Sequence, residues 1–194
     1  MAFVTPNITD RFTAYLADIL TTRLSLAVWL TDEYTQMKPA GNIKVLIEEG
    51  DINAVKNLSG YYLFNDLADG NYNIIIESDL YFSEEMTVAV PCPDPKNPVI
   101  EITLNPRPAY PFPNNATLVR GLLSNTDPIV NAEVSVLGKT IKSKTNEKGE
   151  FALFFEGIKK EDIAIEIKKD GTTKTVNATI EEGKTVSIGK ITFP

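Results

Sequence analysis

The sequence has no histidine and only one cysteine in 194 residues. Histidine is the commonest general base and a frequent zinc ligand, so its absence excludes Ser-His-Asp and Cys-His catalytic arrangements and histidine-containing zinc sites. A glycine-rich phosphate loop of the Walker type is also missing. Five pairs of adjacent acids occur, and neighbours on a strand point to opposite faces, which disfavours paired acid–base catalysis. The sequence therefore predicts a protein that is not an enzyme and that uses no cofactor.

The lone Cys92 lies in the loop Pro91-Cys-Pro-Asp-Pro and has no partner for an intramolecular disulfide. Proteins of reducing compartments share this property. The first residues lack the basic start and apolar stretch of a secretory signal. No apolar run approaches the roughly 18–20 residues that span a bilayer. We therefore expect a cytoplasmic protein, or one incorporated into a particle from the cytoplasm, without a membrane partner.

Negative charge is concentrated in the first half of the chain. Residues 1–106 carry a net charge of −9 and residues 107–194 a net charge of +2, giving −7 in total. Phosphate binding needs a clustered cationic surface, so the acidic half argues against a nucleic-acid partner. The residues that come closest to a calcium-binding pattern are Asn65, Asp66 and Asp69. They lack the spacing of a dedicated calcium loop. No metal is expected.

Residues 8–20 are predicted to form an amphipathic helix. Their apolar residues follow helical spacing and would share one face; they are Ile8, Phe12, Tyr15, Leu16, Ile19 and Leu20. Asn7 or Thr9 can cap the helix.

Alternating apolar residues after Arg23 predict strands for the rest of the chain. The first strand begins at Leu24, buries its leucines and leaves Trp29 on the opposite face. A lone exposed tryptophan is uncommon, so two interpretations stay open: the helix folds back over Trp29, or Trp29 meets a partner or ligand. Phe12 and Tyr15 of the helix belong to the same candidate interaction surface. Further strands of the first half are expected over residues 42–48, 60–64, 71–77, 86–90 and 99–104.

A proline-rich segment, residues 105–115, marks a boundary between two domains. It holds four prolines between Pro106 and Pro113, which favours a stiff, extended polyproline conformation. A pure spacer would not need Tyr110 and Phe112. These two aromatics either wedge between the domains and fix their angle or form a docking strip for another subunit.

The second half of the chain repeats the first. Residues 130–137 parallel residues 40–47, residues 145–155 parallel residues 56–64, residues 163–167 parallel residues 72–76, and residues 186–193 parallel residues 99–104. Four matches in the same order indicate two copies of one β-sandwich.

The matched residues resemble the carboxypeptidase regulatory-like domain, a Greek-key sandwich related to transthyretin and to Cna-B-type repeats of surface adhesins. In the first copy the pattern falls on Gly60, Tyr62, Phe64, Leu67, Gly70 and Tyr72, and in the second on Ala132, Val134, Val136, Thr145, Asn146, Gly149, Phe151 and Leu153. These positions carry turns and core, so the resemblance implies an architecture and leaves function open. The second copy departs from the pattern at residues 159–162. The hinge sequence of residues 108–121 is similar to that of stand-alone proteins encoded near phage-tail-like contractile particles.

The sequence thus predicts an all-β chain of two Greek-key transthyretin-like sandwiches in tandem, with one N-terminal amphipathic helix. The expected parts are the helix (1–22), the first sandwich (23–105), the hinge (106–116) and the second sandwich (117–194). We expect a structural or assembly module that contacts a protein partner in a larger complex, or a homo-oligomer. The alternative is a carbohydrate- or peptide-binding sandwich whose stacking platform is Trp29, Tyr61 or Tyr81.

Overall fold

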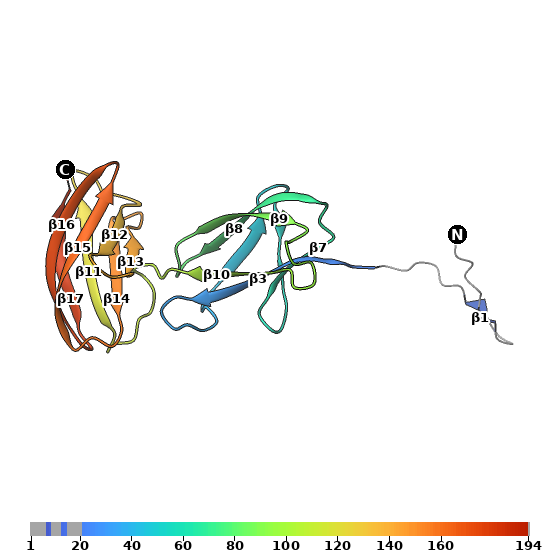
Figure 1. Cartoon of the computed structure of the whole chain (residues 1–194), viewed down its shortest axis with the longest axis horizontal. Helices are drawn as coiled ribbons and strands as arrows, with labels where there is room; N and C mark the ends of the chain where they lie inside the picture. The colour runs from blue at the N-terminus through green and yellow to red at the C-terminus, as the bar shows by residue number, and fades with distance from the viewer. Residues whose placement is uncertain (1–6, 9–12, 15–20, 194) are drawn as a thin grey trace.

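The computed structural model describes residues 21–193 and the backbone of residues 7–8 and 13–14 (Figure 1). This part of the chain is all-β and contains no helix, which confirms the predicted fold class at that level. It accordingly offers no helix that could cross a membrane.

The first half of the described chain forms two four-stranded sheets, ordered β10-β3-β7-β6 and β5-β4-β8-β9. We call them together the first sheet pair. Its strands are β3 (Leu24–Asp32), β4 (Ile43–Ile47), β5 (Ile52–Asn53), β6 (Val55–Lys56), β7 (Tyr62–Asn65), β8 (Gly70–Ser78), β9 (Glu84–Val90) and β10 (Val99–Leu104).

The second half forms a three-stranded sheet, β14-β11-β17, and a four-stranded sheet, β13-β12-β15-β16. We call these the second sheet pair. Its strands are β11 (Thr117–Ser124), β12 (Glu133–Val136), β13 (Lys142–Lys144), β14 (Glu150–Phe155), β15 (Lys160–Lys169), β16 (Thr172–Glu181) and β17 (Thr185–Thr192).

The two sheet pairs share one strand order, except that β6 has no counterpart in the second. In the first, β3 runs parallel to the last strand, β10, and antiparallel to β7. In the second, β11 runs parallel to the last strand, β17, and antiparallel to β14. The other sheet places β4 between β5 and β8 with β9 at the edge, and correspondingly β12 between β13 and β15 with β16 at the edge. The second sheet pair thus repeats the strand order of the first.

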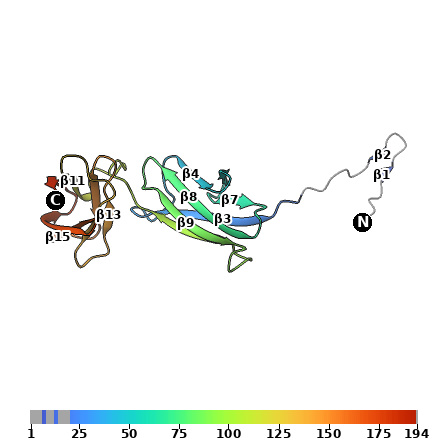
Figure 2. The same cartoon turned by 90° about the horizontal axis from the view of Figure 1, so that it is seen from above.

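Each sheet pair has its own hydrophobic core. Strand side chains alternate between two faces, so the inward residues of both sheets of a pair meet between them, as in a β-sandwich. Leu26, Ile47 and Ile74 belong to the first core, and Val119, Leu153 and Ile165 to the second; all are at most 1% exposed. Figure 2 shows the two pairs one after the other along the molecule, joined by the proline-rich segment.

The predicted N-terminal helix is wrong where the structure describes it. β1 (Asn7–Ile8) and β2 (Thr13–Ala14) pair antiparallel, so Ile8, Thr13 and Ala14 are in strands. A helix of this length is marginal in water without a surface to pack against, and β-branched residues such as Ile8 and Thr13 favour strands. The other residues of the predicted helix, including Phe12 and Tyr15, lie outside the described residues.

The start of the proline-rich segment is held on the first sheet pair. The Phe82 N–H donates to the Asn105 carbonyl at 3.0 Å, and the Arg107 N–H donates to the Leu80 carbonyl at 2.8 Å. Proline lacks an N–H, so residues between the prolines must supply the hydrogen bonds that hold such a segment. These bonds place Tyr110 and Phe112 at the end of the first pair that faces the second.

Candidate functional site

Trp29 lies on the outer face of the sheet β10-β3-β7-β6, opposite the core. Its ring packs against Tyr61, with ring centroids 4.8 Å apart and planes inclined by 47°. Both residues are partly exposed. Tyr61 is therefore the residue seen to cover part of Trp29, and the two form an aromatic pair open to solvent on one side.

Apolar neighbours extend this outer face. Leu63 is in register with Ala27 on one side and with Val55 on the other. Residues two apart on a strand share a face, so these side chains lie beside the Trp29–Tyr61 pair. Tyr81, in contrast, is fully buried, so the prediction that it could serve as a stacking platform is wrong. Its bulk completes the core at the end of the first pair.

Tyr110 and Phe112 form the centre of an aromatic junction between the two sheet pairs. Tyr110 is only 7% exposed and packs with the first core. Phe112 lies 5.0 Å from Tyr34 of the first pair and 6.2 Å from Phe154 on β14 of the second pair, measured between ring centroids. Tyr34 also meets Phe154 directly, edge to face, at 5.3 Å. Edge-to-face and tilted aromatic contacts of this kind are favourable beyond simple burial.

The carboxylate of Asp32, at the end of β3, anchors the junction. Asp32 is 1% exposed, and a buried carboxylate is costly unless hydrogen bonds satisfy it. Its Oδ2 accepts the hydroxyls of Tyr110 at 2.5 Å and Tyr81 at 3.0 Å, while Oδ1 accepts the Tyr34 N–H at 2.8 Å. Burial raises the pKa of Tyr110, and the hydrogen bond to the Asp32 carboxylate raises it further. Asp32 therefore holds Tyr110 as a neutral donor.

Polar contacts also join the two pairs. The Asn105 amide donates to the Lys142 carbonyl at 3.2 Å, and Arg107 pairs with Glu147. Arg120 on β11 donates to the Pro108 carbonyl at 2.7 Å, with its guanidinium over the Phe112 ring. The second pair is thus tied to the connecting segment as well as to the end of the first pair.

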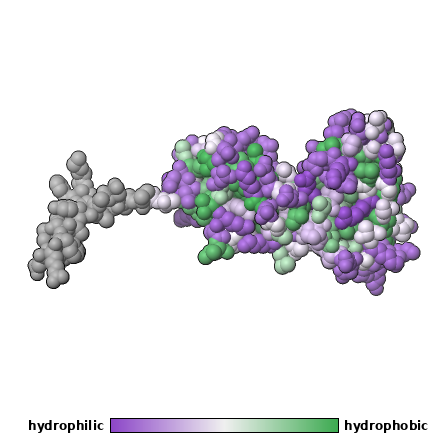
Figure 3. Space-filling model, turned by 180° about the vertical axis from the view of Figure 1, so that it is seen from behind, coloured by the Kyte–Doolittle hydropathy of each residue, from purple (hydrophilic) through white to green (hydrophobic). Residues whose placement is uncertain are grey.

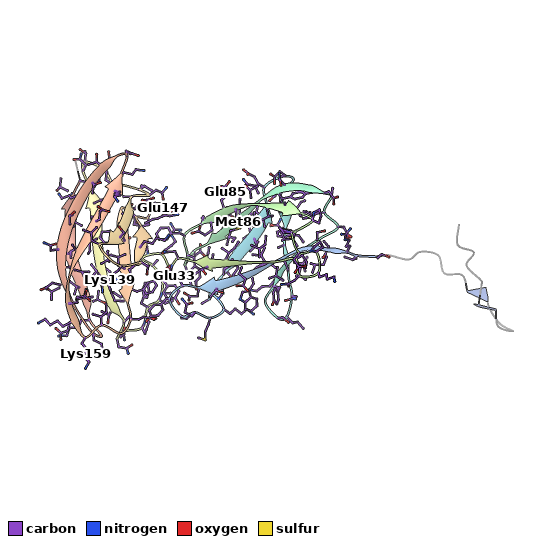
Figure 4. The ribbon with its side chains drawn as sticks, in the orientation of Figure 1. Glu33, Glu85, Met86, Lys139, Glu147 and Lys159 are labelled. Carbon is purple, nitrogen blue, oxygen red and sulfur yellow. The ribbon has the colours of Figure 1, made fainter. Side chains whose placement is uncertain are left out.

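A cleft of about 530 Å³ remains between the pairs beside these contacts. Glu33 and Glu84 line it on the first pair, and Lys142, Lys144 and Lys168 line it on the second. Figure 4 shows Glu33 on the side of the first pair facing the second, and Glu147 on the side of the second facing the first. Burial raises the pKa of Glu33; Lys142 opposes the rise, and the carboxylates of Asp32 and Glu84 add to it.

The described residues offer little for catalysis or metal binding. They contain no group of three or more acids, cysteines or histidines able to hold a metal ion. Asp66 instead follows the end of β7 and accepts the Arg23 N–H at 2.8 Å. Burial raises the pKa of the Cys92 thiol, which disfavours the reactive thiolate.

Sequence reasoning selected Trp29, Tyr110 and Phe112. It missed Asp32, Tyr34 and Phe154, which are the partners of Tyr110 and Phe112. The structure brings Tyr110 and Phe112 together at the junction and leaves Trp29 on a separate outer face. Asp32 and Tyr34 lie between the strand predicted to begin at Leu24 and the one predicted over residues 42–48, where a buried acid gives no periodic signal. Phe154 and Phe155 are adjacent on a strand, so alternation places one of the two side chains outside the core. That alternation was the one sequence signal for a role of Phe154 at the junction.

No protein-family model matches the chain, and no curated protein matches it in sequence. Among solved structures, the Bacillus anthracis TIE protein is similar over 87% of this chain, with 17% sequence identity and a TM-score of 0.35. The match spans 34% of the length of that protein's chain. No family assignment follows from a likeness at this level.

Proposed function

We propose that the chain is a non-catalytic structural or assembly module, which holds two sandwiches at a fixed angle and contacts a protein partner in a larger complex. A phage-tail-like contractile particle is one such complex. The observation that carries the proposal is the aromatic junction, because the buried Tyr110 and the partly buried Phe112 pack between the pairs and do not form an open docking strip. Buried aromatic contacts with several hydrogen bonds restrain the angle between domains more than an open linker would.

We further infer that both sheet pairs are Greek-key, transthyretin-like sandwiches of the carboxypeptidase regulatory-like kind and that each is a domain. Their shared strand order supports the tandem arrangement. The separate cores support two domains, with residues 105–116 as the connection.

The fixed angle can be tested through the junction. Spin labels on cysteines at Glu77 and Thr175, both exposed and on different pairs, would report the distance between the pairs in a Cys92→Ser background. We expect one narrow distance distribution, broadened in Phe112→Ala. Cross-linking in the native host followed by purification should recover partners with the wild type and fewer with Phe112→Ala. A broad distribution in the wild type, or equal recovery by both, contradicts the proposal.

The second candidate, a carbohydrate-binding module, is favoured by the Trp29–Tyr61 pair. Partly exposed aromatic rings on a sheet face offer a stacking surface for the apolar face of a sugar ring. Titration with a panel of soluble oligosaccharides should change the fluorescence of Trp29, the only tryptophan, in a saturable way. Tyr61→Ala should abolish that change; absence of any change in the wild type excludes this candidate.

A further inference from the structure

The strand β4 has a free edge along its first residues. Its neighbour β5 pairs only with Leu46 and Ile47, and the last contact of that side is the Ala54 N–H, which donates to the Val45 carbonyl at 2.9 Å. The chain then leaves this sheet, because Val55 pairs with Leu63 in the opposite sheet. No strand of the described chain therefore lies beside the start of β4 on this side.

The backbone of Ile43 faces this free edge. Glu48 donates its N–H to Asn73, which continues the line of β8, and hydrogen-bonded residues alternate along antiparallel strands. Lys44 and Leu46 consequently direct their backbone groups toward β8, while Ile43 and Val45 direct theirs the other way. The Val45 carbonyl already accepts the Ala54 N–H. The N–H and C=O of Ile43 therefore remain available to an added strand.

A groove of about 570 Å³ runs along this free edge, with the side chain of Tyr62 in its lining. Tyr62 is 4% exposed, and its hydroxyl is buried without a hydrogen-bond partner among the described residues. The Lys56 ammonium lies 4.8 Å from the centre of the Tyr62 ring. A buried hydroxyl without a partner is costly, so a ligand that supplies a donor or acceptor gains affinity there.

The segment that supplies Asn53, Ala54 and Lys56 to the groove also carries exposed apolar side chains. Ile52, Val55 and Leu58 are 39%, 63% and 105% exposed, and all three belong to the short connection between β4 and β7. Figure 3 shows apolar residues in green breaking the polar surface of the first sheet pair. Clustered exposed apolar residues are typical of protein contact surfaces, whereas a sugar site would present an open aromatic face.

We propose that this groove binds an extended segment of a protein partner, which adds to β4 beside Ile43 as a short extra strand. The free edge accepts on the order of three residues at about 3.4 Å each. Side chains of the added strand alternate, so one points inward to Tyr62 and its neighbours point outward past Lys44. The inward residue is serine, threonine or asparagine, because a small side chain with a hydroxyl or amide can pair with the Tyr62 hydroxyl. The inference rests on the proposed role in protein–protein contact and names the partner's chemistry.

The test uses a phage-displayed library of random seven-residue peptides, selected on the full chain. Selected peptides, synthesised with a fluorescent label, should bind wild type and lose about tenfold in affinity with Tyr62→Phe. The matched control is Tyr72→Phe, whose hydroxyl already donates to the Ala68 carbonyl, and it should leave affinity unchanged. Leu58→Ser should weaken binding, while Leu137→Ser on the second pair should not.

Hydrogen exchange identifies strand addition directly. The Ile43 amide should exchange rapidly in the free chain and at least about tenfold more slowly with peptide bound, because the added strand then accepts its N–H. Tyr62→Phe should unfold at the same temperature as wild type or higher, since it removes the unsatisfied hydroxyl, so weaker binding cannot be ascribed to misfolding.

Four results overturn the proposal: no peptide is selected, binding is indifferent to Tyr62→Phe, the Ile43 amide is unchanged by peptide, or that amide is already slow in the free chain. The last would show that the chain fills its own groove. None of these outcomes alters the distance between the sheet pairs, so failure here is distinguishable from failure of the proposed function.

Discussion

Asp32 joins the first sheet pair to the segment that leaves it. A carboxylate at 1% exposure would destabilise the fold if it stood alone, yet it accepts two tyrosine hydroxyls and backbone N–H groups. The same bonds fix Tyr110, and Tyr110 in turn supports Phe112 at a centroid distance of 4.7 Å. Asp32 thus holds Tyr110, 78 positions away in the sequence, in contact with Phe112.

Tyr110→Phe removes one donor from the Asp32 carboxylate while keeping the ring. We expect the free energy of unfolding to fall by about 1.5–3 kcal/mol, the usual contribution of a hydrogen bond to a charged group. Chemical denaturation monitored by Trp29 fluorescence measures the change. Tyr72→Phe, which loses a more exposed hydrogen bond, is the control and should cost less than about 1 kcal/mol. Equal costs for the two variants would show that the Asp32 network does not stabilise the fold.

High pH should weaken the fold through Tyr110. Its pKa is raised in the folded chain by burial and by its hydrogen bond to Asp32, whereas an unfolded tyrosine ionises near pH 10. The folded state therefore holds the proton more tightly, and this contribution is present below about pH 10 and lost as pH rises toward the folded pKa. Wild type should lose more stability than Tyr110→Phe between about pH 9 and pH 11. The same dependence in both would exclude Tyr110 as its source.

Single acids such as Asp32 give no signal in a sequence. Burial of a polar residue depends on which distant hydroxyls reach it, and Tyr81 and Tyr110 are 49 and 78 positions away. Trp29, by contrast, could be placed on the outer face because strand alternation is a local property.

Among the elements, strands with large, alternating apolar residues could be predicted from the sequence. Strands made mainly of polar residues could not. β3 and β14 carry a clear core face. β16 was not identified, because Thr172–Glu181 offers only one fully buried apolar residue, Ile180. The short β5 and β6 were also missed, since each holds two residues that are exposed. The prediction of an N-terminal helix was wrong for the opposite reason. The apolar residues of this segment follow helical spacing, but a short helix is stable only when its apolar face packs against a surface.

Gly149 fixes the turn into β14. Its φ is +76°, and a Cβ there would lie 2.2 Å from the Leu123 carbonyl oxygen. Gly149→Ala should therefore destabilise the fold by at least about 2 kcal/mol, since the backbone itself must move. Gly138→Ala is a matched control, because its φ is +77° and nothing lies within 4 Å of the added Cβ. Thermal unfolding of both variants isolates the clash, and equal shifts in midpoint would contradict it.

At the scale of the whole molecule, the described residues form two separate cores, and the aromatic junction lies between them. Chains with distinct cores unfold as one unit when the interface between them is strong. We expect calorimetry to give a single transition for wild type and two for Phe112→Ala combined with Phe154→Ala. Leu137→Ser, an exposed position away from the junction, should keep the wild-type profile. One transition in the double variant would mean that the pairs are not coupled through these rings.

The parallel pairing of first and last strands bears on how the chain carries mechanical load. The chain enters the first pair along β3 and leaves it along β10, six residues of which pair in parallel, and β11 and β17 repeat the arrangement. Tension applied to the two ends of a pair therefore pulls these neighbouring strands past each other lengthwise, so that their hydrogen bonds share the force and break together instead of one after another. A particle that extends or contracts could transmit tension through such a chain without unravelling it.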